Sequence, residues 1–340
     1  MAGVFRDAYL FRDYLRLRAF FLLICLLAFF IYLIRYFNLI SAYPPSFFGA
    51  PSAADLCGGV IFGIGMVLGG GCMLSTLYKL GSGHTVSAIT FFGVLFGGFV
   101  SAAFYPLFRS FAASTVLIKN KTALEHIVGS IGAPVLVTSL LAVSLALRWI
   151  KKGGWSQPAY ARGYLSLWKA SIIMALVIAP MVAFSGRPLA VSTGYAKLSG
   201  LLGGLFLPTL TGKLAFFHIE APRLLYGHIM NGGAAPVLDS VALTQFSLMA
   251  GVVSGSFISS LKLGEFRITR LPPRRQAFSA FFGGMLMAAG ALMAGGCNLW
   301  HLIGGLPLFA LQSMVFALGI AGGACLGAVF IKKAVIRQTK

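Results

Sequence analysis

Two cysteines of this chain each follow a run of small residues, in the sequences GGGC (69–72) and AGGC (294–297). A thiol is a soft and weak hydrogen-bond donor, and it suits a soft sulfur atom better than a hydroxyl would. Glycine disfavours helix, so we expect a helix to break at both sites. Broken backbone at membrane depth persists only inside protein or along a water-filled path. We therefore expect each cysteine to bind substrate at the end of a half-helix, together with its neighbouring glycines. This set is Cys72, Cys297, Gly70, Gly71, Gly295 and Gly296.

Polar residues follow both cysteines and extend the candidate substrate-binding set. Lys79 either neutralises an anion or extends to an interface. His301 lies four residues after Cys297, where one helical turn would place both on one face. It either faces substrate or packs inside the bundle, and Asn298 directly follows the cysteine. The alternative for the Gly-Cys motifs themselves is close helix packing around a small, buried thiol. We assign no residue a catalytic role.

Composition predicts an all-α integral membrane protein, a polytopic helical bundle. Of the 340 residues, 58% are hydrophobic and 10% are charged, and the mean hydropathy is +0.89. A soluble domain has about 25% charged residues. Several stretches without charge approach or exceed the roughly 20 residues of a spanning helix. They are 56–78, 80–108, 129–147, 240–261 and 276–331. The last is long enough for two spans with an interruption, and we expect further helices at 19–41, 170–185 and 197–212.

The net charge of +20 is concentrated between the apolar stretches. Two thirds of the Lys and Arg residues fall within 1–18, 148–169, 262–275 and 332–340. Such blocks follow the positive-inside rule and place both termini in the cytoplasm of a multi-pass inner-membrane protein. This distribution argues against a nucleic-acid partner and for a lipid bilayer.

The chain also contains an internal repeat. A shift of 225 positions superimposes eight residues without a gap. It places Gly58, Gly59, Gly65, Gly70, Gly71, Cys72, Gly97 and Gly98 on Gly283, Gly284, Gly290, Gly295, Gly296, Cys297, Gly322 and Gly323. We expect one membrane transport domain, 1–340, with structural repeats over about 50–110 and 275–335. Duplicated halves with Gly-interrupted segments at matching positions are typical of transporters.

These motifs resemble the YeeE/YedE family of membrane thiosulfate transporters and selenium-linked relatives. The resemblance rests on LGGGC (68–72), AGGCNLWHLIGG (294–305), GSFISSLKLGEFRI (255–268) and GVFRDAYLFRD (3–13), and it covers nearly the whole chain. It implies helices with short re-entrant segments and a cysteine-lined path, in which Cys72 and Cys297 form the central relay pair. It also implies a partner, a small cytoplasmic sulfurtransferase (TusA-like).

One feature of the family pattern is missing from the printed sequence. Family members usually carry an earlier helix with a third cysteine ahead of the Phe-Arg-Asp element, which here is Phe5-Arg6-Asp7. This is expected either of a shortened variant with a two-cysteine path or of a sequence whose true start lies further upstream.

The function expected on these grounds is inward transport, by a transporter or channel, of a small sulfur oxyanion, most simply thiosulfate. The chain carries no phosphate-binding GxxxxGK[ST] motif, and its seven acidic residues flank the apolar runs. We expect no cofactor, no metal and no enzymatic activity. Two alternatives stay open: a soft-metal transporter, for which Cys297 and His301 supply one C-x3-H spacing, and a membrane thiol–disulfide oxidoreductase, which lacks a CxxC pair.

Overall fold

The computed structural model describes Val4 and residues 14–37, 48–129, 132–151, 164–185, 187–219 and 233–336. Within these ranges, seven helical segments are long and apolar enough to cross a membrane. They are α2 (Leu15–Tyr36), α3 with α4 (Ala53–Gly81), α5 (Thr85–Ala103), α9 (Leu167–Ser185), α12 (Ser240–Lys262), α13 (Arg274–Met293) and the greater part of α14 (Leu311–Ile336). The all-α polytopic membrane fold is thereby confirmed.

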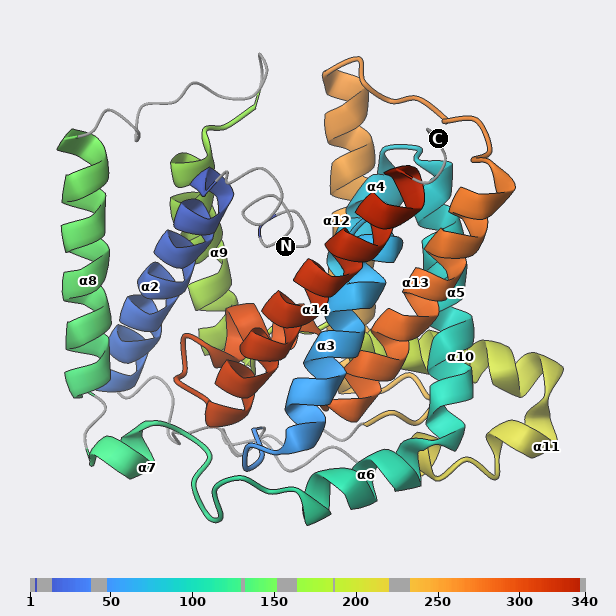
Figure 1. The fold of residues 1–340 in the computed structure, drawn as a ribbon, viewed down its shortest axis with the longest axis horizontal. Coiled ribbons are helices and arrows are strands. Elements are labelled where there is room, and N and C mark those ends of the chain that lie inside the picture. Colours follow the sequence, from blue (N-terminus) through green and yellow to red (C-terminus); the bar gives the residue numbers. More distant parts are fainter. Residues whose placement is uncertain are drawn as a thin grey trace.

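Further helices connect or flank these spans (Figure 1). They are α6 (Tyr105–Ser114), α7 (Glu125–Val128), α8 (Gly132–Lys151), α10 (Ser192–Phe206), α11 (Pro208–Thr211) and a 3-10 turn (Ala215–His218). A π-helical segment, Leu299–Gly305, lies between α13 and α14. The centre of the bundle consists of α3, which packs on α13 and α14, and α5, which packs on α13. A second group, α2 with α8 and α9, lies to one side.

Two of the expected helices are divided by proline. Within the uncharged stretch 80–108, helix α5 ends at Ala103, and α6 begins at Tyr105 with Pro106 in its first turn. The helix expected over 197–212 starts earlier, at Ser192, and ends before Pro208, which opens α11. Proline has no backbone N–H and fits a first helical turn, so it starts a new helix at both places.

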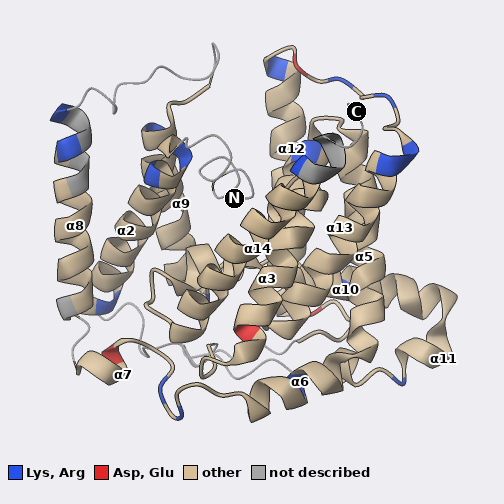
Figure 2. Ribbon diagram, in the orientation of Figure 1, with Lys and Arg blue, Asp and Glu red and all other residues tan. Residues whose placement is uncertain are grey.

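The basic residues gather at one end of the bundle, which we call the basic side (Figure 2). It comprises the start of α2, α9 and α13 and the end of α8, α12 and α14. Its residues are Arg16, Arg18, Arg148, Lys151, Lys169, Lys262, Arg274, Arg275 and Lys332. The start of α3 lies at the opposite end. There Ser52 and Asp55 form a capping box, with the Asp55 carboxylate accepting from the Ser52 N–H and hydroxyl, both at 2.8 Å. Asp55 therefore caps α3, as its position suggests.

The central helices approach each other through pairs of glycines. A Cβ added at Gly290 would lie 2.5 Å from the Gly58 carbonyl oxygen, and one at Gly58 would lie 2.8 Å from the Gly290 oxygen. Gly65 and Gly283 form a second reciprocal pair, with corresponding distances of 2.8 and 2.9 Å. Since 283 and 290 are 58 and 65 plus 225, α3 and α13 meet through residues that the sequence shift had superimposed.

The helices that follow the two Gly-Cys motifs, α5 and α14, align with a shift of 226 residues instead of 225. A Cβ at Gly97 would lie 2.4 Å from Met285 Cα, and one at Gly323 would lie 2.1 Å from the Val60 carbonyl oxygen. At a shift of 225, Val60 superimposes on Met285. Gly323 contacts Val60 and Gly97 contacts Met285, so Gly97 and Gly323 occupy equivalent positions, 226 residues apart. These contacts favour pairing Gly97 with Gly323 over the ungapped pairing with Gly322. The extra residue falls between Cys297 and α14, where the π-helical turn accommodates it, as π-bulges do.

These contacts predict that Gly290→Ala destabilises the protein. The new Cβ would lie 2.5 Å from the Gly58 oxygen and 2.7 Å from the Phe62 nitrogen. Both are backbone atoms inside packed helices, so overpacking should cost at least about 1–3 kcal/mol. Thermal unfolding of the purified protein in detergent measures this. The matched control is Gly322→Ala, because a Cβ there has no neighbour within 4 Å. Equal melting temperatures for the two variants would contradict the prediction.

Candidate functional site

Both Gly-Cys motifs lie where a helix ends. After α3 ends at Leu68, Gly70 has φ +73°, and after α13 ends at Met293, Gly295 has φ +74°. This left-handed conformation is accessible to glycine at little cost. The chain resumes helical structure at Met73 in the first case and at Leu299, as a π-helix, in the second.

Gly71 and Gly296 are needed for a different reason, which is a close approach by the side chain four residues later. A Cβ at Gly71 would lie 2.2 Å from Ser75 Oγ, and one at Gly296 would lie 2.3 Å from Trp300 Cδ1. The predicted glycines thus shape the backbone around each cysteine, and none of them brings a side chain to the site.

Cys72 occupies the N-cap position of α4 (Met73–Gly81), and 3% of it is exposed. Its Sγ accepts a hydrogen bond from the Ser75 N–H at 3.5 Å. Its carbonyl accepts from the Ser75 and Thr76 hydroxyls, at 2.9 and 3.0 Å. The thiol therefore lies at the amino end of a helix, where the backbone dipoles favour negative charge.

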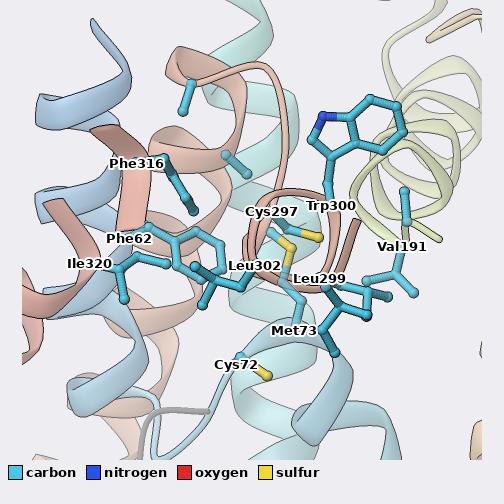
Figure 3. Close-up of a cluster of buried hydrophobic side chains, with 14 of the residues drawn as sticks. Phe62, Cys72, Met73, Val191, Cys297, Leu299, Trp300, Leu302, Phe316 and Ile320 are labelled. Atoms are coloured by element: carbon cyan, nitrogen blue, oxygen red, sulfur yellow. The ribbon is translucent and has the colours of Figure 1, made fainter. Parts of the chain in front are cut away.

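Cys297 is fully buried, and both cysteines belong to one hydrophobic cluster (Figure 3). Met73, Leu299 and Trp300 belong to the same cluster. Tyr195 belongs to this cluster as well, and its hydroxyl donates to the Met73 carbonyl at 3.1 Å. The fold thus brings two segments 225 positions apart into a single buried region.

Asn298 is the most unusual polar residue at this site. It is 1% exposed, yet neither its Nδ2 nor its Oδ1 has a hydrogen-bond partner among the residues that the structure describes. The amide does interact with the Cys72 thiol, but this contact is too long or too poorly aligned to count as a hydrogen bond. A buried amide without a partner carries a desolvation cost of about 1–3 kcal/mol, so the position holds unused hydrogen-bonding capacity beside a thiol.

His301 has internal partners on both ring nitrogens and is fully buried. Nδ1 lies 3.0 Å from Ser313 Oγ, and Nε2 lies 3.1 Å from the Ala294 carbonyl oxygen. Gln312 Nε2 donates to the same carbonyl at 3.0 Å and to Asp55 at 2.8 Å. These contacts favour a positioning role for His301, which holds the carboxyl end of α13 in place ahead of Cys297.

Lys79 reaches back along α4 to the glycine run. Its Nζ donates to the Gly70 carbonyl at 2.6 Å. The ammonium group therefore lies against the loop that precedes Cys72. This contact positions a cation near the break between α3 and α4.

All five cysteines are free thiols, so Cys72 and Cys297 are not joined by a disulfide in this structure. Cys25 is buried, Cys57 is exposed and Cys325 is partly buried. Across the described residues, no three His, Cys, Asp or Glu side chains are grouped so that they could hold a metal ion.

Two contributors to the site were missed by the sequence analysis. Tyr195 and Gln312 were not among the expected residues, although Gln312 is a polar residue within the uncharged block 276–331. That isolation in an apolar run was the available signal for Gln312. Tyr195 lies near the start of α10, and only the packing of α10 against α5 and α12 brings it to Met73 and the cysteine region. The Phe5-Arg6-Asp7 element lies outside the described residues.

Comparison with known proteins identifies relatives over most of the chain. A family model described as sulphur transport matches residues 1–326. The thiosulfate transporter TsuA of Spirochaeta thermophila is 28% identical over 266 residues, covering 76% of this chain and 72% of the relative. TsuA of Escherichia coli is 28% identical over 316 residues, covering 88% of this chain and 79% of the relative. The probable transporter YedE of E. coli is 30% identical over 126 residues, covering 36% of this chain and 30% of the relative.

Proposed function

Because the chain belongs to the sulphur transport family, the YeeE/YedE proteins, we propose that it takes up thiosulfate along a path lined by Cys72 and Cys297. It is a multi-pass membrane transporter for a sulfur compound, not an enzyme. The thiosulfate specificity follows the names of its relatives, TsuA, together with the chemistry of two buried thiols.

The observation that carries this proposal is the buried Asn298 amide, which lies beside the Cys72 thiol and makes no hydrogen bond of standard geometry to any described residue. Thiosulfate has oxygen atoms that accept from an amide N–H and a terminal sulfur that accepts from a thiol. A passing thiosulfate would supply the hydrogen bonds that the protein leaves unmade at Asn298. A hydrocarbon or a small apolar molecule would leave the desolvation cost of that amide unrelieved.

The charge of the anion is offset locally. Cys72 precedes the amino end of α4, whose backbone dipoles favour negative charge. The Lys79 ammonium lies on the same glycine run, at Gly70. We infer that these groups lower the cost of bringing a dianion into a site surrounded by apolar side chains.

Orientation and organisation follow from the charge pattern and the glycine contacts. We infer that the protein lies in the inner membrane and that its basic side faces the cytoplasm. The repeats over about 50–110 and 275–335 each contribute one re-entrant Gly-Cys segment. A small cytoplasmic sulfurtransferase (TusA-like) would receive the sulfur there, and this consumption would drive inward movement.

The proposal predicts that Asn298→Leu loses uptake without losing stability. Leucine has a similar volume and removes the buried amide, so the variant should be as stable as the parent or more stable. Uptake of radiolabelled thiosulfate into cells without their own transporter should fall at least tenfold. The conservative control is Asn298→Gln, which keeps an amide at the site and should retain measurable uptake.

Two results would contradict the proposal. The first is a parent protein that is produced in the membrane yet takes up no thiosulfate. The second is an Asn298→Leu variant with the uptake of the parent. Sulfite and selenate, tested as competitors, define how narrowly the path selects its anion.

A further inference from the structure

A cavity of about 640 Å³ lies outside the cysteine region, between α9, the segment after it and α12. Its lining includes Met181, Ser185, Arg187, Gln245, Leu248 and Val252. These residues come from the end of α9, the loop that precedes α10 and the first half of α12. Because Lys169 lies at the start of α9 and Lys262 at the end of α12, the cavity lies in the half of the bundle away from the basic side.

Two hydrogen-bond donors in this lining are buried without a partner among the described residues, Arg187 Nη1 and Gln245 Nε2. Gln245 is 3% exposed. Its Oε1 accepts from the Gly194 N–H at 2.6 Å, which fixes the orientation of the amide and leaves Nε2 as the free donor. The Ser185 hydroxyl donates to the Arg187 carbonyl at 3.0 Å and so holds the loop that carries the guanidinium.

The local charge around the cavity is positive. Asp239 is the carboxylate that interacts electrostatically with Arg187. However, its oxygens already accept from Lys197 Nζ at 2.7 Å and from the Ala242 N–H at 2.8 Å. Arg187 and Lys197 thus share one carboxylate, and Lys197 takes the closer contact. A buried guanidinium with an unused N–H and an incomplete counter-charge is a group that favours an anion.

We propose that this cavity is a second anion-binding site, in which Arg187 and Gln245 hold a small tetrahedral sulfur oxyanion before it enters the cysteine path. The role in transport rests on the proposed function. The cavity is connected to the path through packing: Pro188, which also lines the cavity, contacts Gly304 of the π-helical segment that follows Cys297. An anion held at Arg187 would therefore lie near the π-helical segment that directly follows Cys297 and Asn298.

Transport kinetics in proteoliposomes test this site, with radiolabelled thiosulfate as the substrate. Arg187→Gln should raise the half-saturating concentration at least about tenfold, since it removes a hydrogen bond to a charged group. The maximal rate at saturation should change much less. Gln245→Glu keeps the acceptor for Gly194 but replaces the free donor with a negative charge, so it should have the same effect. Arg187→Lys keeps the charge and should recover part of the affinity.

The matched control is Lys213→Gln, which neutralises an exposed cation outside the cavity lining and should leave the half-saturating concentration unchanged. An equal effect of Lys213→Gln and Arg187→Gln would show that only overall surface charge matters, and the inference would be overturned. An Arg187→Gln variant with the kinetics of the parent would overturn it as well, while leaving thiosulfate transport intact.

Direct binding separates this inference from the proposed function. The purified Cys72→Ala/Cys297→Ala protein should still bind thiosulfate and sulfate, and adding Arg187→Gln should abolish that binding. If the parent failed to transport thiosulfate yet bound it through Arg187, the proposed function would be wrong and the second site would stand. If binding did not depend on Arg187, the second site would be wrong whatever the transport result.

Discussion

Alanine at either Cys72 or Cys297 is expected to abolish growth on thiosulfate as the sole sulfur source, whereas Cys25→Ala is expected to leave growth unchanged. All three thiols are free and buried, with exposed fractions of 3%, 0% and 6%. Their difference is position, since Cys72 and Cys297 follow glycine runs at helix breaks and Cys25 lies inside α2. Cys25→Ala thus controls for the loss of a buried thiol as such.

We expect growth to be lost because the variants lack a chemical group, not because their fold changes. Cys→Ala removes one heavy atom, so the cavity it leaves is small and the fold should persist. What disappears is the soft donor that faces the terminal sulfur of the substrate. Serine at either position should also fail, because a hydroxyl restores a donor but not a soft one. The growth assay uses a host that cannot reduce sulfate and has no thiosulfate transporter of its own.

Melting temperatures of the purified variants must accompany the growth data. Variants that fold like the parent but do not support growth would place both thiols on the path. Equal growth of all four proteins would assign Cys72 and Cys297 to packing. Growth lost together with a large fall in melting temperature would assign the same residues to stability and contradict the relay.

Lys197→Met is expected to destabilise the protein by about 3–5 kcal/mol, the cost of breaking a buried ion pair from one side. Lys197 is fully buried in α10. Its ammonium donates to the Ala235 and Val237 carbonyls at 2.6 and 3.1 Å and to the Asp239 carboxylate at 2.7 Å. Methionine fills the space of the side chain but leaves all three acceptors without their donor.

The same interaction makes stability depend on acid. Burial by itself would raise the pKa of Asp239, but hydrogen bonds from Lys197 and the Ala242 N–H outweigh it, so the pKa lies below its ordinary value. This contribution is present above the unfolded pKa of about 3.9 and disappears as pH falls through the lower folded pKa. Unfolding in detergent between pH 7 and pH 3 measures it.

Asp239→Asn is the matched control for this pair. It should lose the acid-dependent part of stability, because its side chain no longer titrates. Lys197→Met/Asp239→Asn should be more stable than Lys197→Met alone, since the second change removes the uncompensated carboxylate. An unchanged melting temperature for Lys197→Met would contradict the assignment of Lys197 as an internal tie between α10 and the start of α12.

Much of the architecture was predictable from the sequence by itself. Long uncharged stretches identified most of the spanning helices, because a bilayer requires apolar side chains and internally bonded backbone. Clustered Lys and Arg predicted a common basic side, and the Gly-Cys motifs marked both helix breaks. The motifs also resembled the family that the comparison confirms. These are local properties, carried by residue type and spacing along the chain.

Only the tertiary structure decided what each polar residue meets. His301 and Asn298 looked alike as polar residues just after Cys297. Among the described residues, however, both ring nitrogens of His301 have hydrogen-bond partners, whereas neither side-chain atom of Asn298 makes a hydrogen bond of standard geometry. The partners of His301, Ser313 and Ala294, are brought to it by the π-helical turn and by α14, whose extra residue the sequence shift did not reveal. Arg187 and Gln245, 58 positions apart, likewise meet at one cavity only because the loop after α9 and the first half of α12 line the same space. The free hydrogen-bonding capacity of a buried side chain depends on neighbours distant in sequence, so spacing alone does not determine it.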